Sequence, residues 1–186
     1  MKILVSAIVI ISILTGCSAF DDSCGSALEL RQKILKAESC TFQAQITADY
    51  GSELYRFAMN CTADNSGKLQ FTVSDPSTIA GITGEMSLEG GALTFDDKVL
   101  AFPMLTQLQL TPVSAPWIFL NTLRSGYITG CSEEHDDLLI YIDDSYGEKP
   151  LHLQVRIDQE SAPYYAEIFW EESRILTLDI QNFEIM

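Results

Sequence analysis

Apolar and polar residues alternate throughout residues 41–95, and this pattern restricts the chain to a small set of folds. Two segments show the pattern clearly: Tyr55–Cys61 places Tyr, Phe, Met and Cys at alternate positions, and Leu69–Val73 does the same with Leu, Phe and Val. Gly, Asn, Asp and Pro separate such segments, as they separate short strands. An apolar period of two therefore predicts an antiparallel sheet that is buried on one face only.

The second half of the chain returns to the same pattern after a more apolar stretch. Residues 99–110 predict two short strands around Pro103. Four further strands are predicted at residues 138–142, 151–157, 164–170 and 174–183. The expected total is ten or eleven strands. Strands in such number with few helices indicate one α+β domain dominated by an antiparallel meander.

Two helices are expected between the strands. The first runs from about residue 26 to 38, with Ser26 and Glu29 as a capping box and an apolar stripe that includes Leu28 and Leu35. The second follows Ser114, and Gly126 stands where a left-handed residue would end it. Residues 117–120 are all apolar. This second helix must therefore be deeply buried or face a hollow.

The N-terminal sequence predicts an export signal. Lys2 precedes an apolar run from Ile3 to Leu14, which is shorter than the roughly 20 residues that span a bilayer. Leu14-Thr15-Gly16-Cys17 resembles the lipobox of bacterial lipoproteins, in which the cysteine is diacylated and becomes the mature N-terminus. Ordinary cleavage near Ala19 is the alternative and would discard Cys17. We expect a signal peptide at residues 1–16 and a lipidated tether at residues 17–25.

The composition excludes several functions. With 26 Asp and Glu against 11 Lys and Arg, the formal net charge is −15, so phosphate groups are repelled and nucleic acid is not an expected partner. His135 and His152 are the two histidines, and neither belongs to a catalytic motif. The cluster Cys131–Asp137 offers two metal-ligand types plus carboxylates, fewer than a zinc site needs. We expect no enzyme activity, cofactor or metal.

Four cysteines remain beyond Cys17. Two disulfides are expected in an exported chain. A helix over residues 26–38 would hold Cys24 and Cys40 about 18 Å apart, too far for a disulfide. Cys40 and Cys61 flank the open end of a hairpin that turns at residues 50–52, which predicts a cross-strand bond between them. Cys24 with Cys131 then follows by elimination.

The lipobox, the short first helix and the long meander together resemble the lipoprotein-localisation superfamily, the LolA/LolB/LppX-like group. The matching stretches are 41–59, 71–76 with 79–82, and 168–183. The resemblance implies that residues 26–186 form a LolA-like half-barrel: a strongly curved antiparallel sheet, or incomplete β-barrel, with two or three short helices on its concave side.

In that family acyl chains bind in the hollow under the helices. The resemblance therefore implies a membrane-anchored lipoprotein on the extracytoplasmic face that binds a lipid, or the acyl chain of a lipoprotein, in lipid handling at the cell envelope. The alternative, suggested by a lipoprotein of spore-forming clostridia, is a platform that binds and regulates an envelope enzyme such as a cortex amidase. The expected lining of the hollow is Phe57, Met59, Phe71, Met86, Phe95, Trp117, Phe119 and Leu120.

The lipobox generates a direct test. Because diacylation needs the thiol of Cys17, a Cys17→Ala variant should appear in the soluble fraction or accumulate as an uncleaved precursor. Fractionation with immunoblotting measures both outcomes, and Cys24→Ala serves as the matched control that should stay with the membrane. Normal processing and membrane retention of Cys17→Ala would disprove the anchor.

Overall fold

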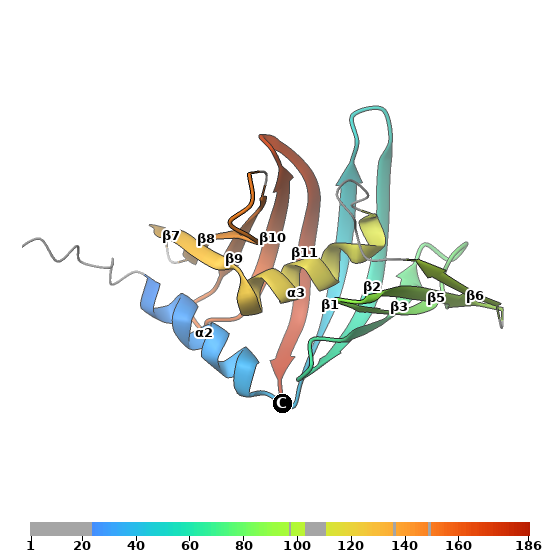
Figure 1. The fold of residues 1–186 in the computed structure, drawn as a ribbon, viewed down its shortest axis with the longest axis horizontal. Helices are drawn as coiled ribbons and strands as arrows, with labels where there is room; N and C mark the ends of the chain where they lie inside the picture. Colours follow the sequence, from blue (N-terminus) through green and yellow to red (C-terminus); the bar gives the residue numbers. More distant parts are fainter. Residues whose placement is uncertain (1–23, 97, 103–110, 136, 149) are drawn as a thin grey trace, which may run out of the picture.

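A single unclosed antiparallel sheet of eleven strands dominates the structure, and two helices pack against it (Figure 1). The computed structural model describes residues 24–96, 98–102, 111–135, 137–148 and 150–186. The expected signal peptide, the lipidated Cys17 and the strand predicted between residues 105 and 110 lie outside these ranges. Among the described residues, no helix has the length and apolarity needed to cross a membrane.

The strands follow one another along the chain, with a helix before β1 and another before β7. They are β1 (Ser39–Asp49), β2 (Leu54–Asp64), β3 (Leu69–Asp75), β4 (Thr83–Ser87), β5 (Gly90–Phe95), β6 (Lys98–Phe102), β7 (Tyr127–Glu134), β8 (Asp137–Asp143), β9 (Leu151–Ile157), β10 (Pro163–Trp170) and β11 (Ser173–Ile185). The helices are α2 (Gly25–Lys36) and α3 (Ala115–Ser125), and a short 3₁₀ turn, η2 (Pro112–Ser114), leads into α3.

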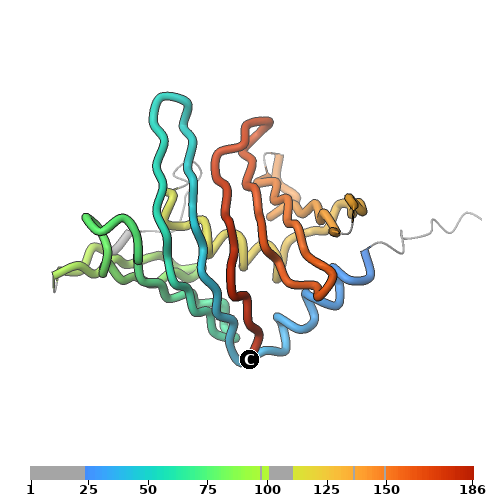
Figure 2. Tube along the Cα trace, turned by 180° about the vertical axis from the view of Figure 1, so that it is seen from behind, coloured from blue at the N-terminus to red at the C-terminus, as the bar shows by residue number. Residues whose placement is uncertain are grey.

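The sheet consists of two meanders joined side by side. Its order is β6-β5-β4-β3-β2-β1-β11-β10-β9-β8-β7, so every neighbour is a hairpin partner except the central pair. β1 and β11 form that pair, in register from Cys40 with Ile185 to Ala48 with Leu176. Both helices lie on one side of the curved sheet, in front of it in Figure 1 and behind it in Figure 2. The predicted α+β fold with an incomplete barrel is confirmed.

The alternating pattern separates a buried from a solvated face. In β2, for example, Phe57, Met59 and Cys61 are buried, whereas Asn60 and Thr62, which alternate with them, are exposed. The buried residues of the strands and of both helices form one continuous apolar cluster. Burial of that face against the helices supplies the main stabilising term of the fold.

Helix α2 forms where it is predicted, but its details differ. Ser26 lies inside the helix, and Cys24 occupies the N-cap position without a side-chain capping bond, so the capping box is wrong. The buried stripe is Ala27, Leu30 and Ile34, one position in three or four, while Leu28 and Leu35 are exposed. These three residues join the apolar cluster and attach α2 to the core.

Helix α3 also forms where it is predicted, and it ends at Gly126 for another reason than expected. Gly126 has φ −70° and ψ 171°, an extended conformation that any residue can adopt. A Cβ atom added at this glycine would lie 2.7 Å from the carbonyl oxygens of Thr122 and Asp143. Close approach to β8, rather than a left-handed turn, therefore requires the glycine.

The structure confirms one of the two predicted disulfides. Cys24 at the start of α2 bonds to Cys131 in the edge strand β7, across 107 residues of sequence. Cys40 and Cys61 are free, so the other prediction is wrong. In the β1–β2 register Cys61 faces Phe42, and Cys40 faces Ala63. The two thiols are thus two residues out of register, and burial raises the pKa of each.

Gly126 provides a test of the packing between α3 and β8. Gly126→Ala should lower the free energy of unfolding by about 1–3 kcal/mol, because the new methyl group overlaps main-chain atoms that cannot move aside cheaply. Gly130→Ala is the matched control: its Cβ would meet only Cδ2 of Tyr141, at 3.8 Å. Urea denaturation of both variants measures the difference, and equal stabilities would contradict this account.

Candidate functional site

The candidate site is the apolar surface formed by helix α3 and the buried face of strands β2, β3 and β4. Met59 of β2, Phe71 of β3 and Met86 of β4 all point to that face and are almost completely buried. Phe71 faces Cys61 across the β2–β3 ladder, and Leu69 faces Met86 across the β3–β4 ladder. Adjacent strands thus place these side chains together as one apolar surface.

Helix α3 is apolar on nearly every side. Eight of its eleven residues are buried, from Ala115 through Leu120 and then Thr122 and Leu123. Globular helices that lie on a surface bury only one stripe, whereas a helix buried all round lies within a core or between two apolar surfaces. The curved sheet, α2 and η2 together therefore cover most of the surface of α3.

Aromatic rings fix α3 against the central strand pair. Phe119 meets Phe42 of β1 edge-to-face, with ring centroids 5.8 Å apart, and meets Phe183 of β11 at 6.4 Å. Phe42 and Phe183 are themselves 5.8 Å apart. Edge-to-face pairs are favourable beyond their buried area. The three rings together anchor the middle of α3 over the junction of the two meanders.

Side-chain hydrogen bonds to main-chain carbonyls attach α3 to the β2–β3 turn. Trp117 donates from Nε1 to the carbonyl oxygen of Gly67, 3.1 Å away, in the β2–β3 turn. Arg124 donates to the carbonyls of Asp64 and Asn65 in the same turn, at 3.0 and 2.7 Å. These bonds tie the helix to a turn rather than to other side chains.

Arg31 of α2 forms the third attachment. Its Nε donates to the carbonyl oxygen of Leu123, 2.8 Å away, in the last turn of α3. A cation at the C-terminal end of a helix also interacts favourably with the helix dipole. One terminal nitrogen of Arg31 is buried and has no hydrogen-bond partner among the described residues. Burial accordingly lowers the pKa of Arg31.

Seven of the eight residues predicted to line the hollow are buried in the continuous apolar cluster. They are Phe57, Met59, Phe71, Met86, Trp117, Phe119 and Leu120. Phe95 is the exception, because it is 55% exposed and so does not join the others. It is the last residue of β5 and faces Lys98 at the end of the outermost hairpin. The sequence pattern alone does not show that the buried face stops before this hairpin end.

Two residues of the site are missing from the predicted lining. Phe42 continues the alternation of β1, so the period-two signal could have found it. Phe183 could not be found in this way, since it breaks the phase set by Leu176, Leu178 and Ile180. A bulge in the β1–β11 pair, where Asn182 has φ 52°, turns Phe183 back to the buried face.

The polar cluster at 131–137 has no arrangement suited to a metal. Cys131 is bonded to Cys24, so its thiolate is unavailable as a ligand. His135 is exposed and has φ 62°, at the turn between β7 and β8. Within the described ranges, no group of three or more His, Cys, Asp or Glu side chains lies close enough to hold a metal ion.

Comparison with known proteins finds similarity in structure alone. No family model and no curated protein matches the sequence. A DUF1329 family protein from Desulfovibrio piger is similar with a TM-score of 0.50 at 8% identity, over 88% of this chain and 92% of that protein. A LolA superfamily protein from Nitrosomonas europaea gives 0.46 at 8% identity, over 86% and 93%. The lipoprotein LppX from Mycobacterium tuberculosis gives 0.43 at 10% identity, over 87% and 93%.

These neighbours include proteins of the LolA/LppX-like group that the sequence resembles, and at identities of 8–10% the shared property is the fold alone. They do not favour the alternative in which the chain regulates an amidase in spores.

The attachments of α3 generate a prediction. Arg124→Met keeps the aliphatic stem but removes both bonds to the β2–β3 turn, so the free energy of unfolding should fall by about 1 kcal/mol. Amide hydrogens of the turn and of α3 should exchange faster. Arg156→Met is the matched control, because it removes an ion pair to Glu134 whose two side chains are 30% and 43% exposed. An equal loss of unfolding free energy in the two variants would contradict an anchoring role for Arg124.

Proposed function

We propose that this protein binds a lipid or a single acyl chain between helix α3 and the buried face of β2–β4. The observation that carries the proposal is the burial of α3 on nearly every side, which presents apolar surface both to the central strands and to the rest of the concave face. An acyl chain needs a continuous apolar path of this kind, closed off from water.

Two methionines support this choice of ligand. Met59 and Met86 lie on neighbouring parts of the same face, and both are at most 1% exposed. Methionine is unbranched and has several rotatable bonds, so its side chain can move aside and pack again around a flexible guest. A face built only from branched residues would resist such rearrangement.

The attachments of α3 fit the same role. Trp117, Arg124 and Arg31 hold the helix through main-chain carbonyls, and none of these bonds involves the side chains of Met59 or Met86. The apolar contacts under the helix can therefore change while the polar attachments at its rim persist. A bound acyl chain would replace side-chain contacts without breaking these hydrogen bonds.

The proposal also includes the localisation of the protein. The lipobox at Cys17 and the fold shared with lipoprotein-sorting and LppX-type proteins support an envelope-associated lipoprotein, anchored on the extracytoplasmic face by acyl groups on that cysteine. The role is non-enzymatic: the protein holds an acyl chain of a lipid or lipoprotein near the membrane. An envelope protein that delivers or receives the lipid would be its partner.

The variant Met86→Trp distinguishes a binding site from an ordinary packed core. We expect purified, delipidated wild-type protein to take up a fluorescent fatty acid and a natural fatty acid to displace it. Met86→Trp should block uptake while costing little stability, because the indole fills space that the guest would occupy. Leu88→Trp, at an exposed position next to the same strand, should leave uptake unchanged.

Thermal unfolding of the three proteins completes this test. In a core without room for a guest, Met86→Trp would overpack and lose about 1–3 kcal/mol. A wild type that takes up no apolar probe, together with a strongly destabilised Met86→Trp, would overturn the proposed function. Native mass spectrometry of protein from its own host, searching for co-purified lipid, provides an independent check.

A further inference from the structure

A second candidate surface lies on the polar face of the sheet, opposite helix α3. It is an open groove of about 590 Å³ over strands β2 to β6. Asn60 and Thr62 of β2 line it, and these residues alternate with the buried Met59 and Cys61. The groove therefore shares the strands of the acyl site but faces the other way. Its volume is within the range of small-molecule sites.

The groove is lined by two rows of polar side chains that run across the strands. The first row follows the ladder partners from β2 to β5: Asn60, Thr72, Thr83 and Thr94. The second contains Thr62, Gln70 and Glu85. Neighbouring strands lie about 4.8 Å apart, so each row presents a hydroxyl or amide group at that interval. Thr72 and Thr83, in the middle of the first row, are exposed.

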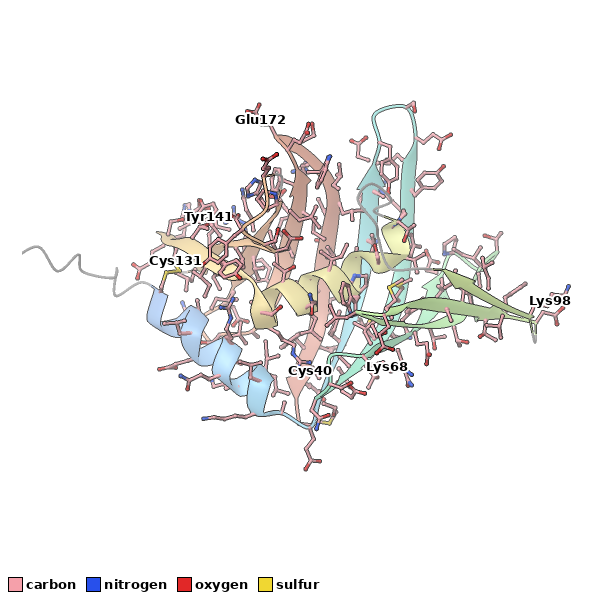
Figure 3. All side chains as sticks on the ribbon, viewed as in Figure 1. Cys40, Lys68, Lys98, Cys131, Tyr141 and Glu172 are labelled. Carbon is pink, nitrogen blue, oxygen red and sulfur yellow. A yellow bond between two sulfur atoms is a disulfide. The ribbon has the colours of Figure 1, made fainter. Side chains whose placement is uncertain are left out.

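The lining has almost no free charge, although the chain carries a net charge of −15. Glu85 is the one charged residue among the lining residues, and its carboxylate is paired with Lys68 at 2.6 Å. Figure 3 shows Lys68 on this half of the sheet and Lys98 at the tip of its outermost hairpin. Hydroxyl and amide groups both donate and accept hydrogen bonds. They suit an uncharged ligand with many hydroxyl groups.

The backbone under the groove is unavailable to a peptide. β3, β4 and β5 are each paired on both sides, so their main-chain donors and acceptors are used within the sheet. A peptide that adds to a sheet needs an unpaired edge. Side chains alone must therefore recognise a ligand that lies across these strands. Polar side chains recognise sugars in this way.

The groove has a small apolar component that fits the C–H surfaces of sugar rings. Val99 and Ala92 supply it, paired with Thr94 and Glu85 on the polar face. The row direction also fits, since one pyranose in an extended chain is about as long as the spacing between strands, roughly 4.8 Å.

We propose that this groove binds a neutral glycan, an extended chain of uncharged pyranose units that lies across β2 to β6. The two rows supply hydrogen bonds to ring hydroxyl or acetamido groups, and the threonine methyls, Ala92 and Val99 contact the ring faces. The proposed glycan site lies on the opposite face of the sheet from the acyl site. Its test therefore does not depend on lipid binding.

The test uses chitopentaose, a neutral N-acetylglucosamine oligomer, titrated into the ¹⁵N-labelled protein up to about 10 mM, a range that detects even weak millimolar affinity. Amide signals of the groove strands should shift and saturate. The double variant Thr72→Val, Thr83→Val removes two central hydroxyls at exposed strand positions that valine also favours. Its affinity should fall about tenfold, as expected for the loss of one or two hydrogen bonds.

Thr47→Val is the matched control, because Thr47 lies on the same polar face but in β1, outside the groove. It should bind chitopentaose as the wild type does. No saturable shift with the wild type, or an unchanged affinity in the double variant, would overturn the proposal. Equal binding of an anionic hyaluronan oligomer, or groove shifts produced by a neutral peptide but not by the glycan, would overturn it as well.

Discussion

The ladder between β1 and β11 is the interaction on which the rest of the structure depends. Each meander is built from local hairpins, but one helix covers both of them, because Phe119 of α3 meets Phe42 of the first meander and Phe183 of the second. Pairing Ala48 with Leu176 and Cys40 with Ile185 brings the two faces into one curved surface. The three phenylalanines at this junction then hold α3 in the middle of the surface.

The sequence predicts what depends on local periodicity and misses what depends on neighbours. Alternation found nearly all central strands, and the apolar run at residues 117–120 found α3. It missed β7, whose Gly130, Ser132 and Glu133 give no apolar alternation, since an edge strand needs none. The expected number of strands is right, but the expected set includes a segment at residues 105–110 that lies outside the described residues. Edge strands are defined by what lies beside them rather than by their own composition.

Register is the second property that composition does not reveal. Shifting the first hairpin by two residues leaves every side chain on its predicted face, so the burial pattern is right while the pairing of Cys40 with Cys61 is wrong. A bulge has the opposite effect, because one extra residue at Asn182 changes the face on which Phe183 lies. The buried face of the site was therefore largely predictable, whereas its exact members at strand ends and bulges were not.

The disulfide between Cys24 and Cys131 determines how the molecule responds to a mechanical load. A pull on the chain before residue 24 would otherwise act first on α2, which could unwind and then peel β1 from the centre of the sheet. The covalent bond instead transmits the force to β7, the outermost strand of the opposite meander. Tension then reaches the edge of the sheet before its centre, and the central ladder and α3 are shielded from it. In the proposed lipoprotein, this arrangement would separate the tethering point from the proposed binding surface.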